Sequence, residues 1–93
     1  MKISGLIIQN KNIAVNTEDE FQAKYKGKLI IITTNHGFGK AKWDHLKRFM
    51  IDVTDMKTGM HDVDTYQDFH TMQDAIRFAL IGACLISDST VRY

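Results

Sequence analysis

The feature of this sequence that most constrains its fold is an apolar segment near the C-terminus, residues 72–86. Its apolar residues form two stripes at helical spacing, with Met72, Ile76, Ala79, Leu80 and Ala83 in one stripe and Phe78, Ile81 and Leu85 in the other. Thr71 followed by Asp74 is a weak capping box that predicts the helix start. A helix that is apolar nearly all round must be covered nearly all round. We therefore expect a sheet on one side, and a second helix, another copy of the chain or a foreign partner on the other.

Three other segments have strand patterns. Lys28–Thr34 (KLIIITT) holds four successive apolar residues, typical of a central strand covered on both faces. Apolar and polar residues alternate over 46–56 and again over 60–69, and the Lys57-Thr58-Gly59 turn between them predicts a hairpin. A further hairpin is expected at the N-terminus, where the runs 3–9 and 13–15 flank Asn10-Lys11-Asn12.

Residues 18–26 fit two structures. Thr17 with Glu20 three residues later resembles a capping box, and Gly27 after Lys26 resembles a helix end. Phe21 and Tyr25 then share a helical face, so we favour a short helix over 18–26. The alternation of Phe21, Ala23 and Tyr25 also fits a strand, and this alternative stays open.

These elements predict an α+β fold of two layers. An antiparallel-rich sheet of four or five strands would pack against the C-terminal helix and one short helix. The 93 residues are expected to form one domain, residues 1–93, with a frayed tail at 87–93.

Composition narrows the function classes. No apolar run reaches the ~20 residues needed to cross a bilayer, and the single cysteine, Cys84, excludes an internal disulfide, so we expect a cytoplasmic protein. In the apolar helix, Cys84 is expected to be a buried small hydrophobe. Residues 1–48 carry nine Lys/Arg and four Asp/Glu, whereas residues 49–93 carry three and seven. The two halves would create opposed surface fields unless their strands interleave, in which case the fields cancel.

The segment NHGFGKAKWDHLKR, residues 35–48, is the first candidate for binding. It lacks the glycine spacing of a phosphate loop. Its basic and aromatic residues could bind nucleic acid or a partner protein: Lys40, Lys42, Trp43, Lys47 and Arg48. The alternative is a glycine turn at 35–39 that leads into a strand near Lys40, with Trp43 in the core.

The run 61–70 is the second candidate. With strand alternation, acidic residues and a tyrosine of this run point to one side, and with Asp52 they form an acidic strand face of Asp52, Asp62, Asp64, Tyr66 and Asp68. His61 falls on the opposite side, which makes a metal site shared with it awkward, and the spacing is not that of a calcium loop. We interpret this face as either a solvated strand surface or a site for a basic partner.

No motif in the sequence indicates catalysis or a cofactor, so we expect a non-enzymatic protein without cofactor or metal. The favoured hypothesis is a small protein that binds and inhibits or modulates a larger protein or nucleoprotein complex. In size and style the chain is similar to inhibitors from phages and mobile elements, such as anti-CRISPR proteins, although no motif matches a named family. Two alternatives remain: nucleic-acid binding through 40–48, and a homodimeric structural domain paired through the 72–86 helix.

Overall fold

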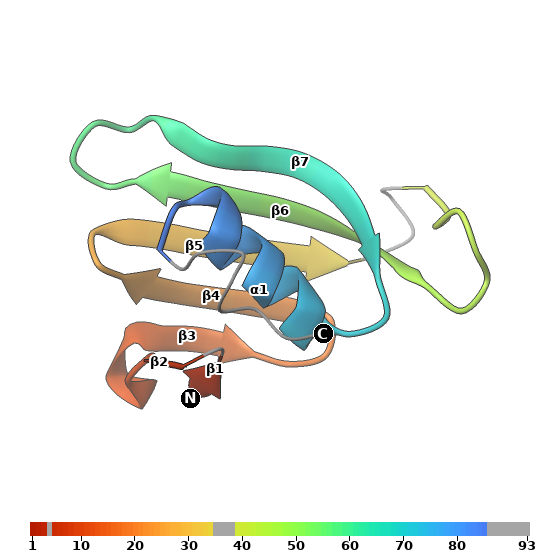
Figure 1. The fold of residues 1–93 in the computed structure, drawn as a ribbon, viewed down its shortest axis with the longest axis horizontal. Helices are drawn as coiled ribbons and strands as arrows, with labels where there is room; N and C mark the ends of the chain where they lie inside the picture. The colour runs from red at the N-terminus through yellow and green to blue at the C-terminus, as the bar shows by residue number, and fades with distance from the viewer. Residues whose placement is uncertain (4, 35–38, 86–93) are drawn as a thin grey trace.

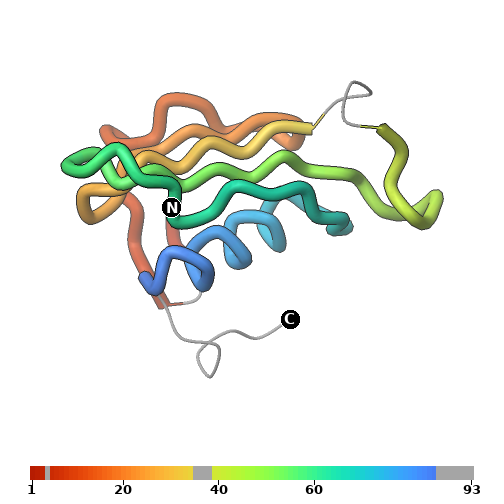
Figure 2. Tube along the Cα trace, turned by 90° about the horizontal axis from the view of Figure 1, so that it is seen from above, coloured from red at the N-terminus to blue at the C-terminus, as the bar shows by residue number. Residues whose placement is uncertain are grey.

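The structure is a computed structural model that describes residues 1–3, 5–34 and 39–85. Its main element is a five-stranded antiparallel sheet in the order β3-β4-β5-β6-β7, in which each strand pairs with the next one along the chain (Figure 1). The strands are β3 (Ile13–Asn16), β4 (Glu20–Tyr25), β5 (Lys28–Thr34), β6 (Lys47–Asp55) and β7 (His61–Phe69). Helix α1 (Met72–Gly82) lies on one face of this sheet, as Figure 2 shows. The predicted two-layer α+β class is confirmed.

The predicted short helix over 18–26 is wrong, because these residues contribute strand β4. Thr17 Oγ1 does accept hydrogen bonds from the N–H groups of Asp19 and Glu20, but these contacts close a turn before a strand. Every residue of β4 pairs with β5. Lys26 and Gly27, with φ of 47° and 77°, form the two-residue turn between the strands, as positive φ at both positions favours.

The predicted N-terminal hairpin between 3–9 and 13–15 is also wrong. The chain folds back much earlier, so that β1 (Lys2–Ile3) pairs with β2 (Leu6–Ile7), and the 3-10 helix η1 (Asn10–Asn12) then leads into β3. Ile3 and Ile8 are both 2% exposed in the main core. An apolar run folded on itself buries more of its side chains than one extended strand would, which explains this arrangement.

The strands predicted from Lys28, from 46–56 and from 60–69 are confirmed as β5, β6 and β7. β5 is central as predicted, but the described residues cover only one of its faces, and Leu29 and Ile31 on the other face are half-buried. The turn between β6 and β7 forms around Asp55, whose Oδ1 accepts hydrogen bonds from the N–H groups of Lys57 and Thr58. The β6–β7 register shifts between Val53 and Thr54. This irregularity decides where Asp62 points.

Helix α1 begins after Thr71, whose Oγ1 accepts a hydrogen bond from the Asp74 N–H as predicted. It packs on β5, β6 and β7, and the buried residues Ile3 and Ile8 of the N-terminal segment join the same core. No large apolar residue of α1 is among the exposed ones. The second predicted stripe, Phe78, Ile81 and Leu85, is half-buried, and no second α-helix covers it among the described residues, so the copy or foreign partner expected there stays a prediction. Cys84 lies beyond the end of α1 and is exposed, contrary to the prediction that it is buried.

The described residues between β5 and β6, 39–46, form turns and bends instead of the strand expected near Lys40. Trp43 is 55% exposed, so the interpretation that it packs into the core is wrong. The predicted glycine turn at 35–39 falls mostly outside the described residues, and the predicted frayed tail at 87–93 lies wholly outside them.

Candidate functional site

The sheet has one face that α1 does not cover, and we call it the open face. In Figure 2 the described part of the chain places α1 and the N-terminal segment on the opposite face. Alternation along β4 to β7 places these side chains on the open face: Glu20, Gln22, Lys24, Leu29, Ile31, Thr33, Arg48, Met50, Asp52, Thr54, Asp64, Tyr66 and Asp68. Leu29, Ile31 and Met50 form its half-buried apolar centre.

The β7 side of the open face is acidic and aromatic. Tyr66 pairs across the ladder with Met50 and is 55% exposed, and Asp64 pairs directly with Asp52. Two carboxylates in directly opposed positions repel each other. This repulsion makes the pair a favourable place for a cation.

His61 supplies an imidazole to this acidic pair, and the imidazole is cationic when it is protonated. Its Nδ1 lies 3.0 Å from Asp52 Oδ1, and the Thr54 hydroxyl donates to the same oxygen over 2.8 Å. The hydrogen bond to Asp52, helped by the charges of Asp52 and Asp64, raises the pKa of His61 above its usual 6.5, although desolvation opposes the shift. Thr54 and Asp52 contact the same ring nitrogen, so the three residues do not form the relay of a hydrolase triad, which needs both nitrogens.

Asp62 does not share this face, contrary to the predicted alternation. The register shift turns it toward Lys28, whose ammonium lies 2.6 Å from Asp62 and 2.9 Å from Asp55. The hydrogen bond from Lys28, followed by those from Thr58 and Lys57, lowers the pKa of Asp55 to about 2.

Asp68 is on the open face but is occupied. Arg48 Nε donates to it over 3.0 Å and the Lys42 N–H over 2.9 Å, and these two hydrogen bonds hold the pKa of Asp68 below its usual value. Ion pairs of this kind, like those of Lys28, join the basic half of the sequence to the acidic half. The strands of the two halves do not interleave, however, because β3, β4 and β5 lie on one side of the sheet and β6 and β7 on the other.

The predicted basic segment, residues 40–48, borders an open pocket of about 580 Å³. Its lining includes Lys40, Trp43, Lys47 and Arg48. The ammonium of Lys42 lies 5.5 Å from the centre of the Trp43 ring. Arg48 is paired with Asp68, and Lys47 lies 3.7 Å from Asp19. The structure thus brings the predicted residues together but leaves Lys40 and Lys42 as the cations without an ion pair to a described carboxylate.

A second open pocket, of about 360 Å³, was not predicted from the sequence. We call it the end pocket, and its lining residues come from the N-terminal segment and from the end of β4: Ile7, Ile8, Gln9, Lys11, Asn12, Lys24, Tyr25 and Lys26. Each of its two segments looks ordinary in the sequence. Only the fold brings them together, so no local pattern signals this site.

No known protein family, curated protein or solved structure matches this chain. Within residues 1–3, 5–34 and 39–85, no three His, Cys, Asp or Glu side chains lie close enough to hold a metal ion. A membrane-spanning helix is not found in the same residues either. The function is therefore argued from the surfaces just described.

Proposed function

We propose that this protein is a small non-enzymatic module that binds and modulates a larger protein or nucleoprotein complex through the open face. One observation carries the proposal: the described helix covers one side of the five-stranded sheet, while the other side presents Leu29, Ile31 and Met50 with Tyr66 beside them. Within the described residues, one side of the sheet therefore has no second layer and is available to a partner.

The size of the open face suits a protein partner. Strand spacings of about 4.8 Å and a rise of about 3.4 Å per residue give a face of roughly 19 by 24 Å across the five strands and along β5. This is about 460 Å², more than half of the ~800 Å² that each partner contributes to a standard interface, so a protein partner would cover the whole face and part of its rim. Interfaces also combine an apolar centre with a polar rim and favour tyrosine, as here.

The charges of the open face indicate the chemistry of the partner. Asp52 and Asp64 oppose each other beside Tyr66, and among the described residues His61 is the basic side chain that contacts Asp52. A partner that places Lys or Arg opposite this pair, and apolar side chains opposite Met50, relieves the repulsion and buries the apolar centre. A basic surface that normally holds nucleic acid has this chemistry, which supports a modulator of a nucleoprotein complex.

A pull-down experiment tests this proposal by comparing substitutions on the open face with one outside it. Tyr66→Ala and Met50→Lys should each weaken capture of a stoichiometric protein partner from bacterial lysate by about tenfold or more, as for central interface residues. Met60→Lys introduces the same charge at a residue that is 69% exposed outside the open face, and should leave capture unchanged. Equal capture by Met50→Lys and Met60→Lys would show that the open face is not the docking surface.

Exposure of Trp43 favours a second candidate function, binding of single-stranded nucleic acid by the basic segment. An exposed indole next to Lys42 can stack a base while lysines neutralise phosphates. Trp43 is the single tryptophan of the chain, so quenching of its fluorescence by oligo-dT reports on this site alone.

Salt dependence decides whether this second candidate holds. With Lys40 and Lys42 as the available cations, log affinity should fall with log salt at a slope of about −1.4, against about −2.8 if Lys47 and Arg48 also release counterions. Absence of quenching at about 50 mM salt, where phosphate-driven binding is strong, removes nucleic-acid binding through this segment.

A further inference from the structure

The end pocket exists because β3 is too short to cover the whole outer edge of β4. The β3–β4 ladder stops at the pair Ile13 and Ala23, and η1 then carries the chain away. Lys24 and Tyr25 still pair with β5 but have no strand on their other side. Because antiparallel residues alternate the direction of their backbone groups, one of these two residues directs its N–H and C=O into the pocket.

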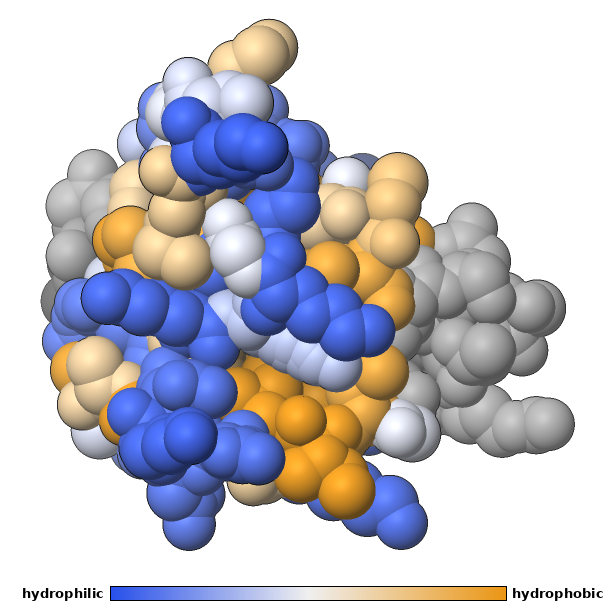
Figure 3. All heavy atoms as spheres, turned by 90° about the vertical axis from the view of Figure 1, so that its left-hand side faces the viewer, coloured by the Kyte–Doolittle hydropathy of each residue, from blue (hydrophilic) through white to orange (hydrophobic). Residues whose placement is uncertain are grey.

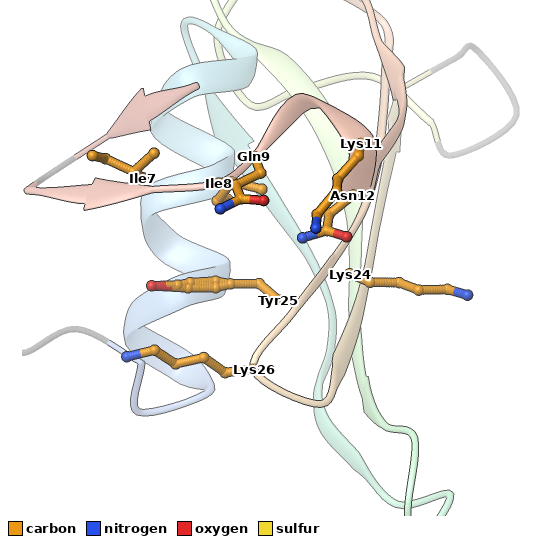
Figure 4. Close-up of a pocket in the computed structure, with 8 residues that line it drawn as sticks. All are labelled: Ile7, Ile8, Gln9, Lys11, Asn12, Lys24, Tyr25 and Lys26. Carbon is orange, nitrogen blue, oxygen red and sulfur yellow. The ribbon is translucent and has the colours of Figure 1, made fainter.

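An aromatic ring forms one wall of the end pocket. In Figure 4 the Tyr25 ring lies between the side chain of Lys26 on one side and those of Ile7 and Gln9 on the other. The Lys26 ammonium is 5.4 Å from the ring centre. Ile7 is 68% exposed, although apolar side chains of this size gain from burial. A flat group that enters between Ile7 and Tyr25 stacks on the ring and covers Ile7.

The charge of the end pocket has one sign. None of its eight lining residues is acidic and three are lysines, Lys11, Lys24 and Lys26. None of the ion pairs between described residues involves these lysines. Figure 3, which views the molecule from the left-hand side of Figure 1, shows strongly polar surface next to apolar surface. The pocket therefore suits a ligand that is both anionic and partly flat and apolar.

We propose that the end pocket binds a nucleoside monophosphate, at a site that shares only Lys24 with the open face and goes beyond the proposed function. The base stacks on Tyr25 opposite Ile7, and the amides of Gln9 and Asn12 hydrogen-bond its polar edge. The phosphate is held by Lys26, whose ammonium lies beside the Tyr25 ring, whereas Lys11 lies at the other end of the pocket (Figure 4). The volume of about 360 Å³ lies within the ~300–1,000 Å³ range of small-molecule sites.

Titration of the whole protein with three probes tests this proposal. AMP, adenosine and inorganic phosphate are each added to ¹⁵N-labelled protein at ~0.15 M salt, where weak surface attraction is screened. We expect saturable shifts at residues 7–12 and 24–26, with AMP at least about tenfold tighter than either fragment because base and phosphate bind together. Equal shifts with phosphate alone, or shifts centred on 39–48, overturn the proposal.

Two variants separate the contribution of base stacking on Tyr25 to AMP affinity from that of the Lys26 charge. Tyr25→Leu keeps an apolar side chain against the core but should weaken AMP by about fivefold or more, the effect of losing one stacked base. Lys26→Gln should weaken it by about two- to fivefold, since the pair is exposed. Lys57→Gln changes the same charge at an exposed turn outside the pocket and should have no effect. An equal loss of AMP affinity with Lys57→Gln would indicate non-specific attraction and refute the site. A variant of the open face such as Tyr66→Ala should bind AMP as tightly as the wild type.

Discussion

His61 and Asp52 contact each other across the β6–β7 ladder, with Nδ1 and Oδ1 3.0 Å apart. This contact raises the pKa of His61, so the stability it contributes is fully present below the unfolded pKa of about 6.5 and is lost as pH rises through the folded pKa. The imidazole also neutralises part of the acidic pair on the open face. Protonation of His61 is therefore linked both to folding and to the charge that a partner meets.

A titration of His61 followed by NMR checks this relationship. We expect a midpoint above 6.5 in the wild type and a lower one in Asp52→Asn, because the largest cause of the shift is removed. Asp62→Asn removes a carboxylate that faces Lys28 instead, and should leave the His61 midpoint near that of the wild type. A midpoint that Asp52→Asn does not lower contradicts the assigned contact.

The Lys28–Asp55 pair predicts an acid-dependent loss of stability. The pKa of Asp55 is lowered to about 2, so its contribution is present above the ordinary carboxyl value of about 3.8 and disappears as pH falls toward 2. Asp55→Asn keeps an oxygen for the Lys57 and Thr58 N–H groups but removes the charge. Its urea midpoint should lie below that of the wild type at pH 7, and the two midpoints should converge near pH 2. A constant difference between them across this range would show that the charge is not the cause.

Core burial predicts that Leu80→Asp prevents folding. Leu80 is fully buried, and a desolvated carboxylate costs several kcal/mol against a total stability of about 5–15 kcal/mol. Met60→Asp places the same group on a side chain that is 69% exposed and should change the free energy of unfolding by about 0.5 kcal/mol or less. Circular dichroism during urea unfolding measures both. A folded Leu80→Asp protein would mean that α1 is not the core element described here.

The sequence was enough to predict those helices and strands whose local residue pattern fits only one kind of secondary structure. The alternation of β6 and β7, the apolar run of β5 and the Thr71 cap each fit one structure, and each was confirmed. Residues 18–26 failed because their local signals are shared by two structures: the Thr17 hydroxyl caps a turn as readily as a helix, and Gly27 suits a hairpin as well as a helix end. The pairing of β4 with β5 decides between them, and that pairing is not visible within the segment itself.

The candidate sites depend even more on tertiary structure. Strand alternation correctly placed Asp64, Tyr66 and Asp68 together, but it could not anticipate the register shift that turns Asp62 to Lys28. The exposure of Trp43 likewise depends on how residues 39–46 leave the sheet. The end pocket joins two segments that are 12 or more residues apart, and no spacing rule connects Asn12 to Lys24.

The packing of Gly82 against Val63 gives a prediction opposite to helix propensity. A Cβ added at Gly82 would lie 2.6 Å from Val63 Cγ2, a buried branched side chain on β7 that has little room to move. Alanine favours a helix over glycine by about 1 kcal/mol, yet overpacking costs about 1–3 kcal/mol. Gly82→Ala should therefore lower the free energy of unfolding or leave it nearly unchanged.

A double-mutant cycle isolates the steric contribution at this contact. In a Val63→Ala background the clashing methyl is gone, so adding Gly82→Ala should raise the free energy of unfolding by up to about 1 kcal/mol, the gain from helix propensity. The two substitutions should thus be coupled by about 1–3 kcal/mol, as for residues in direct contact. Additive effects in urea unfolding would show that α1 does not approach β7 as closely at Gly82 as the structure indicates.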